Sequence, residues 1–157
     1  MIVVADTSPI NFLVLIDAVD LLPALYGKIL IPRTVFLELQ DLRAPGKVRR
    51  WIMQPPEWLE VQSAARSIHP ALLHLDAGEQ EALQLALELG ESTVLIDEID
   101  GRVAAQSLYI QVRGTLGILE QASNFGKINF REALAKLDQH KFRISPALRK
   151  QFLRRHP

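Results

Sequence analysis

Short apolar runs alternate with helix-like segments along this chain. Five such runs are predicted as strands: 2–6, 28–32, 59–61, 93–97 and 110–113. The first run has no polar interruption before Asp6, which is typical of a strand buried on both faces. The alternation of strands and helices predicts an α/β protein with a parallel sheet of about four or five strands and helices on both faces.

Caps and turn residues predict where the helices begin. Ser8 suits the N-cap and Pro9 the first turn of a helix that runs towards Asp17. The clearest helix begins at Asp76 and ends near Gly90. Further helices are predicted over 21–26, 34–42, 101–108, from 115 to Gly126, from 130 towards 139, and from 146 onwards.

The length of 157 residues predicts one domain over 1–157. Residues 43–76 are the least regular stretch because five Pro and Gly residues interrupt them. Residues 141–157 are predicted as a basic C-terminal helix, since seven of the eight charged residues from Lys136 onwards are Lys or Arg. A solvated helix face and a surface for a polyanion both fit that charge.

The amino-acid composition excludes several kinds of site and segment. The chain has no cysteine, which excludes disulfides and thiolate metal sites. No apolar stretch is long enough to span a bilayer and no leader pattern opens the chain, so we expect a cytoplasmic protein with no membrane association.

Two of the predicted strands deliver an acidic residue to their carboxyl ends. Asp6 follows the first strand and Asp97 ends the fourth, and both reach one crevice if these strands are neighbours where the strand order reverses. Glu79 lies on the inward stripe of the helix that precedes the fourth strand. Clustered carboxylates without Cys or a His group select Mg²⁺ or Mn²⁺. Such an ion activates water for attack on a phosphodiester.

Structural explanations compete with each of these assignments. Asp6 could be a turn residue held by nearby backbone N–H groups. Glu79 could form a capping box with Asp76. Glu38, one turn into a helix, is from its own segment better placed in water than in a cleft.

Other chemistries fit the sequence less well. It contains neither a GxSxG motif nor a Gly-rich phosphate loop, and its four histidines are scattered. A receiver domain would carry an acidic pair after the first strand, and a haloacid-dehalogenase-type phosphatase would carry Asp-x-Asp there, whereas Thr7 and Ser8 follow Asp6.

In order and spacing, several segments resemble the PIN-domain ribonucleases, close to the VapC-like toxin branch. The matching segments cover nearly the whole chain: Val4–Pro9, Leu30–Pro32, Val35–Leu39, Asp76–Ala82, Leu95–Glu98, Gly114–Gly117 and Phe142–Ser145.

The resemblance implies a small α/β/α domain with an acidic pocket that binds Mg²⁺ or Mn²⁺ and cuts RNA. Carried over by position, the four acids are Asp6, Glu38, Glu79 and Asp97, which reverses the expectation for Glu38. Four further candidates lie beside them: Ser8, Glu98 and Thr115 as accessory residues, and Asp100, at a position where a basic or neutral residue is expected. The resemblance also implies a homodimer and a cognate antitoxin protein.

These observations lead to one hypothesis and one rival. The hypothesis is a metal-dependent endoribonuclease, the toxin of a toxin–antitoxin pair, whose RNA is held by basic residues in 43–50 and in the C-terminal helix. The rival is a catalytically weak module of the same fold that binds RNA or an antitoxin.

Overall fold

Five parallel strands form one sheet in the computed structural model, which describes all 157 residues. The order across the sheet is β3-β2-β1-β4-β5, so the order reverses between β1 and β4. The strands are β1 (Ile2–Ala5), β2 (Ile29–Ile31), β3 (Leu59–Val61), β4 (Ser92–Leu95) and β5 (Gln111–Arg113). The α/β class and the parallel sheet predicted from the sequence are therefore confirmed, with the full five strands.

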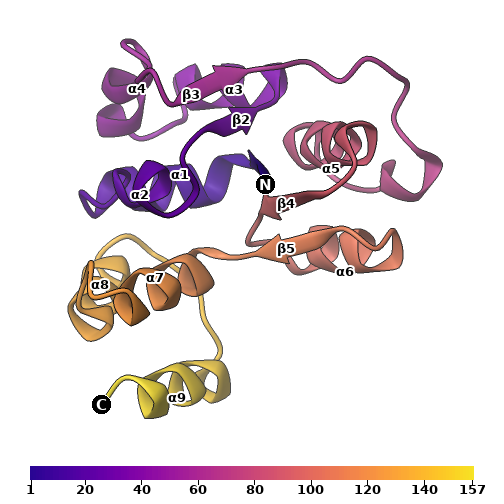
Figure 1. Ribbon diagram of the computed structural model, residues 1–157. Coiled ribbons are helices and arrows are strands. Elements are labelled where there is room, and N and C mark those ends of the chain that lie inside the picture. The colour runs from indigo at the N-terminus through magenta and orange to yellow at the C-terminus, as the bar shows by residue number, and fades with distance from the viewer.

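Nine α-helices and one 3₁₀ turn connect and extend these strands. They are α1 (Thr7–Leu15), α2 (Leu21–Tyr26), α3 (Arg33–Gln40), α4 (Gly46–Ile52), η1 (Pro70–Leu72), α5 (Ala77–Leu89), α6 (Ile99–Ser107), α7 (Thr115–Asn124), α8 (Phe130–Asp138) and α9 (Pro146–Arg155). Figure 1 shows α5 and α6 on one side of the sheet, and α1, α2, α7 and α8 on the other. No helix has the length and apolar composition needed to cross a membrane.

The alternation of side chains along β1 divides the core in two. Val3 and Ala5 pack with the layer of α1 and α7, whereas Val4 packs with α5 and α6. All three side chains are almost fully buried. The unbroken apolar run of the first strand therefore has the expected cause, since it lies at the centre of a sheet covered on both faces.

The outer face of α5 binds a loop that has no regular structure. Glu88 accepts the N–H groups of Ala65 (2.7 Å) and Arg66 (3.0 Å), and Glu81 accepts that of Ala64 (3.1 Å). These acidic residues therefore anchor the chain between β3 and η1, and Glu81 also accepts the N–H (2.9 Å) and the hydroxyl (2.7 Å) of Thr34 at the start of α3.

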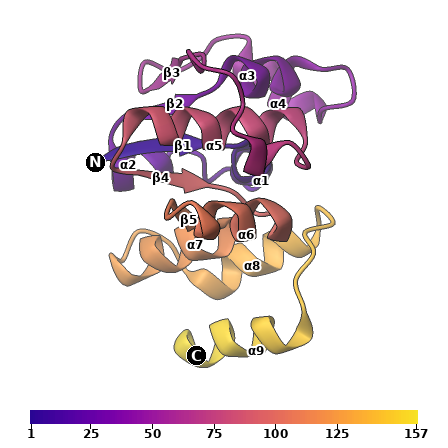
Figure 2. The same ribbon diagram turned by 90° about the vertical axis from the view of Figure 1, so that its right-hand side faces the viewer.

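Helix α9 forms a layer of its own beyond α7 and α8. Figure 2 shows it furthest from the sheet, joined to α8 by an extended segment. Ser145 caps it by accepting the N–H of Leu148, and Pro146 is its first residue, as the Ser-Pro pattern indicates.

Candidate functional site

Asp6 and Asp97 reach the same edge of the sheet because they follow neighbouring strands. In the β1–β4 register Ala5 lies opposite Leu95, and the N–H of Asp6 donates to the carbonyl of Leu95 (2.9 Å). The strand order reverses between these two strands. The two residues thus lie at the topological switch point, where open α/β sheets bind their ligands.

The carboxylate of Asp97 is held by the start of α7. The N–H and the hydroxyl of Thr115 each donate to it, both at 2.7 Å. Burial raises the pKa of Asp97, against the lowering effect of Thr115 and of the nearby Arg102 guanidinium. Thr115, expected as an accessory residue, is the first residue of α7 after Gly114 and orients Asp97.

Asp6 is 4% exposed and lies at the start of α1. Burial raises its pKa to about 7, opposed by the N–H of Thr7 and reinforced by the negative charges of Asp76, Glu38 and Asp97. Asp6, not Ser8, occupies the N-cap position of α1, and it makes no side-chain capping bond. The prediction of Ser8 as the cap is wrong because the helix begins two residues earlier, at Thr7, so that Asp6 is the only residue between β1 and α1.

Glu79 has one carboxylate oxygen with a partner and one without. Its Oε1 accepts the N–H of Asp76 (3.4 Å), while Asp76 accepts the N–H of Glu79 (2.9 Å), so the capping box is present. Its Oε2 is buried and has no hydrogen-bond partner. Burial, together with Asp76 and the charge of Asp6, raises the pKa of Glu79 to about 8. Capping therefore leaves half of this carboxylate unsatisfied.

Glu38 comes to the same edge from α3. The hydroxyl of Thr7 donates to its Oε2, and its carboxylate lies against Gly78 in the first turn of α5. Its negative charge also reaches Asp6, whose pKa it raises. The structure thus places Glu38 beside the other acids and not in open water.

Three glycines leave room for three of these carboxylates. A Cβ at Gly78 would lie 2.7 Å from both oxygens of Glu38, and one at Gly101 would lie 2.8 Å from Oε2 of Glu79. At Gly114 it would lie 3.0 Å from Oδ1 of Asp97. All three glycines lie at the N-termini of helices, whose positive dipole ends stabilise negative charge by about 0.3–1 kcal/mol each.

The remaining predicted candidates differ in how close they lie to this group. Ser8, on α1, and Glu98, which precedes α6, line a groove that begins at Asp97. The charge of Glu98 raises the pKa of Asp97. Asp100 is exposed in the first turn of α6 and is not among the carboxylates that raise the pKa values of Asp6, Glu79 or Asp97.

Three residues that contact or influence the acids were not singled out for this role from the sequence. Asp76 acts on both Asp6 and Glu79, Thr7 binds Glu38, and Arg102 acts on Asp97. The D-x-x-E spacing and the position of Thr7 next to Asp6 were available signals. Nothing in the local pattern marks Arg102, which lies in the first turn of α6, five residues after Asp97.

The carboxylates of Asp6, Glu38, Glu79 and Asp97 suit a hard divalent cation. All of their possible ligand atoms are oxygens, one of these oxygens (Glu79 Oε2) has no hydrogen-bond partner, and none of the four residues is in an ion pair. No three His, Cys, Asp or Glu side chains are arranged closely enough to form a ready-made metal site. The chemistry of the group therefore suits Mg²⁺ or Mn²⁺, while its spacing is wider than that of a closed coordination shell.

Fold and site together define a doubly wound parallel α/β domain with an acidic crevice at its switch point. A family model described as a PIN domain matches residues 2–157, and the chain belongs to the PIN-domain family. PIN domains are in general nucleases that act with divalent metals, so this fold is a nuclease fold. No curated relative matches the chain.

Proposed function

We propose that this protein is a Mg²⁺- or Mn²⁺-dependent endoribonuclease that hydrolyses phosphodiester bonds in RNA. One observation carries the proposal: two buried and two half-buried carboxylates gather at the carboxyl edge, and none of them is in an ion pair. Burying like charges together is unfavourable, and two of these groups have pKa values raised to about 7 and about 8. A functional site is the usual reason why such an arrangement persists.

Each residue has a distinct part in this proposal. Asp6 and Asp97 would hold the ion directly or through water, and Glu38 and Glu79 would complete the pocket. When bound, a divalent cation polarises the phosphodiester and makes a water molecule more acidic. Thr115 fixes the rotamer of Asp97, and Thr7 that of Glu38. Both therefore reduce the reorganisation needed when substrate binds.

The test is Mn²⁺-dependent cleavage of RNA by matched variants. Asp6→Asn preserves shape and removes the charge, so cleavage should be lost while the thermal transition persists. Glu57→Gln makes the same kind of change at an exposed acid outside the crevice, and it should cleave like wild type. Full cleavage by Asp6→Asn would refute the assignment.

The toxin role, the antitoxin and the homodimer are part of the same proposal. They rest on the resemblance to the VapC-like branch and not on a particular contact. Expression of the chain alone should arrest growth in a manner that depends on Asp6, and mapping the RNA cut in those cells would identify the target. If cells that express a cleavage-active protein grow normally, the nuclease function stands and the toxin role is refuted.

The rival function is an RNA-binding or antitoxin-binding module with a weak pocket. The wide spacing of the carboxylates is the observation that favours it. It predicts no Mn²⁺-dependent cleavage and no heat on titration with Mn²⁺, whereas the enzyme predicts both.

A further inference from the structure

A groove of about 1040 Å³ begins at Asp97 and extends to the C-terminal helix. Its walls come from α6, β5, α7 and the segment 141–152. Pockets for small ligands have volumes of about 300–1,000 Å³. The size of this groove and its start at the acidic crevice therefore suit an extended chain that leads into the site.

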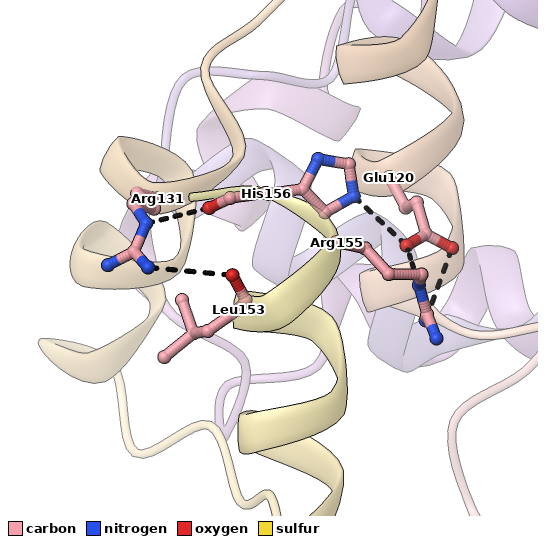
Figure 3. Close-up of polar contacts among 5 residues, drawn as sticks. All are labelled: Glu120, Arg131, Leu153, Arg155 and His156. Atoms are coloured by element: carbon pink, nitrogen blue, oxygen red, sulfur yellow. Dashed lines mark hydrogen bonds and ion pairs between the residues drawn. The ribbon is translucent and has the colours of Figure 1, made fainter.

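Helix α9 is held in place as the outer wall by a polar clamp at its far end. Figure 3 shows the Arg131 guanidinium donating to the carbonyls of His156 (2.7 Å) and Leu153 (3.5 Å), and Glu120 accepting from Arg155 (2.7 Å) and contacting His156 (3.0 Å). The ring of His156 also stacks on Phe130, at 4.6 Å between centroids. The clamp fixes α9 in position while leaving residues 141–148 to line the groove.

The free charges away from Asp97 and Glu98 in this groove are positive. Arg102, Lys141 and Arg143 are exposed and form no ion pair. The groove's remaining acid, Glu120, is already bound by Arg155 and His156. A ligand in the groove thus meets three exposed cations. Lys141 and Arg143 have no carboxylate partner, whereas Arg102 also lies near Asp97. A fourth cation, Arg113, lines the groove half-buried and donates to Gln121.

Apolar side chains lie between these cations. Phe142 packs edge-on against Phe12, with 4.9 Å between their centroids, and Ile144 follows two residues later. Arginine and lysine beside ring and aliphatic surfaces are typical of sites for single-stranded nucleic acid, where the phosphates meet the cations and the bases meet the apolar surface.

The other basic cluster, residues 43–50, lies outside this groove, and two of its four cations are already paired. Arg43 is paired with Asp41 and Lys47 with Asp17, and neither lines the groove. Its other two cations, Arg49 and Arg50, form no ion pair but do not line the groove either. The expectation that residues 43–50 hold the RNA is therefore not favoured, whereas the expected contribution of the C-terminal segment gains a specific place.

We propose that this groove binds a single-stranded stretch of RNA, with its phosphates on Arg102, Lys141 and Arg143, and guides it to Asp97. The inference rests on the proposed nuclease function, because continuity with the acidic crevice is what selects RNA over another anionic chain. In this proposal, α9 forms one wall of the groove along which the RNA reaches Asp97.

The experiment measures binding of a fluorescently labelled 12-nucleotide single-stranded RNA by anisotropy, in EDTA, at several salt concentrations. The test variant is Lys141→Glu with Arg143→Glu. The matched control is Lys150→Glu with Arg154→Glu, which makes the same charge change at exposed positions of α9 outside the groove. Arg102→Gln, on α6, is an independent second variant should the first double variant fail to fold.

The test variant should weaken binding at least about 30-fold, and its slope of log K against log salt should fall by about 1.4, since each phosphate contact on a single strand contributes about 0.7. Arg102→Gln should weaken binding about fivefold and lower the slope by about 0.7. The control should stay within about threefold of wild type.

Equal losses in test and control variants would overturn the proposal, because the effect would then be general charge. Wild-type affinity in the test variant would overturn it too, as would tighter binding of a 12-residue glutamate peptide than of RNA. Because EDTA prevents metal-dependent cleavage, binding is read separately from activity. Groove-dependent binding by a protein that never cleaves RNA would refute the nuclease function and leave the groove assignment intact.

Discussion

The acids at the carboxyl edge and the acids on the surface of this protein behave in opposite ways. On the surface, Asp17, Asp41 and Asp138 each pair with a cation, and hydrogen bonds from that cation lower their pKa values, to about 2 for Asp41. At the edge, burial raises the pKa values of Asp6, Glu79 and Asp97. The native structure therefore favours the charge at the first set and opposes it at the second.

Glu120, in the clamp of α9, shows that burial alone does not explain this difference. Burial by itself raises its pKa, but hydrogen bonds from Arg155 and His156 outweigh that effect and the net shift is downward. No edge acid accepts a hydrogen bond from a cation, although Arg102 lies near Asp97, and Glu79 Oε2 has no partner of any kind. Their missing partner, in the proposed function, is the divalent cation.

The largest expected effect is on activity. Asp97→Asn should lower the rate of RNA cleavage at least about 1,000-fold, equivalent to about 4.1 kcal/mol, because it removes a charge that would hold the ion while keeping an acceptor for the N–H of Thr115. Single-turnover cleavage with Mn²⁺ measures this. Asp138→Asn, a surface acid paired with Arg149, is the matched control and should retain the wild-type rate. Equal rates for the two variants would contradict the account.

Next in size is the pH dependence of stability without metal. Asp6 has a native pKa of about 7 against an ordinary value of 3.8, so the unfolded chain loses this proton first as the pH rises. Stability should fall between about pH 4 and pH 7, by up to about 4 kcal/mol for this group, and Glu79 should extend the fall towards pH 8. Thermal unfolding in EDTA should therefore occur at a lower temperature at pH 8 than at pH 5.

The Asp6→Asn variant sharpens this result. It lacks the buried ionisable group, so its unfolding temperature should vary less between pH 5 and pH 8 and should exceed that of wild type at pH 8. A steeper fall in the variant would show that Asp6 is not the group that opposes ionisation.

A smaller effect is expected from the glycines that make room for the acids. Gly101→Ala would push on Glu79 Oε2 and on the side chain of Ile96, and Gly78→Ala would push on Glu38, so each should weaken Mn²⁺ binding about 10-fold. Gly117→Ala in α7 is the control, since a Cβ there meets only the flexible side chain of Arg113. Calorimetry and thermal unfolding together separate lost affinity from lost stability, and an affinity drop in Gly117→Ala alone would contradict the assignment.

The smallest effect concerns the surface set. Glu120→Gln removes the charge that Arg155 and His156 share, and should destabilise the protein by about 0.5–1 kcal/mol, or about 1–4 °C in Tm. The loss should shrink in high salt, because exposed ion pairs are screened. Mn²⁺ affinity should stay at the wild-type value, and a change there would couple the clamp to the acidic crevice.

The sheet was predictable because it depends on local patterns. Uninterrupted apolar runs marked β1 and β4, and the acids that follow them marked the edge. The starts of two helices were predicted less accurately. Helix α6 begins at Ile99, two residues before the predicted start, and α1 begins at Thr7, before Pro9. The N-cap residues of these helices are Glu98 and Asp6, and neither side chain makes a capping hydrogen bond.

The composition of the site was harder to predict because it depends on contacts across the fold. From its own segment Glu38 was better placed in water, and only packing of α3 against α5 brings it to Thr7 and Gly78. Asp76 was interpreted as a cap, which it is, but it also adds charge beside Asp6. No periodicity in the sequence encodes either relation.

Titration of the metal-free protein with Mn²⁺ at pH 8, followed by calorimetry, tests the central claim most directly. The account predicts a saturable heat for wild type that is absent in Asp6→Asn and unchanged in Asp138→Asn. No heat in wild type, or equal heat in Asp6→Asn, would contradict the claim that the unpaired carboxylates exist to hold a cation.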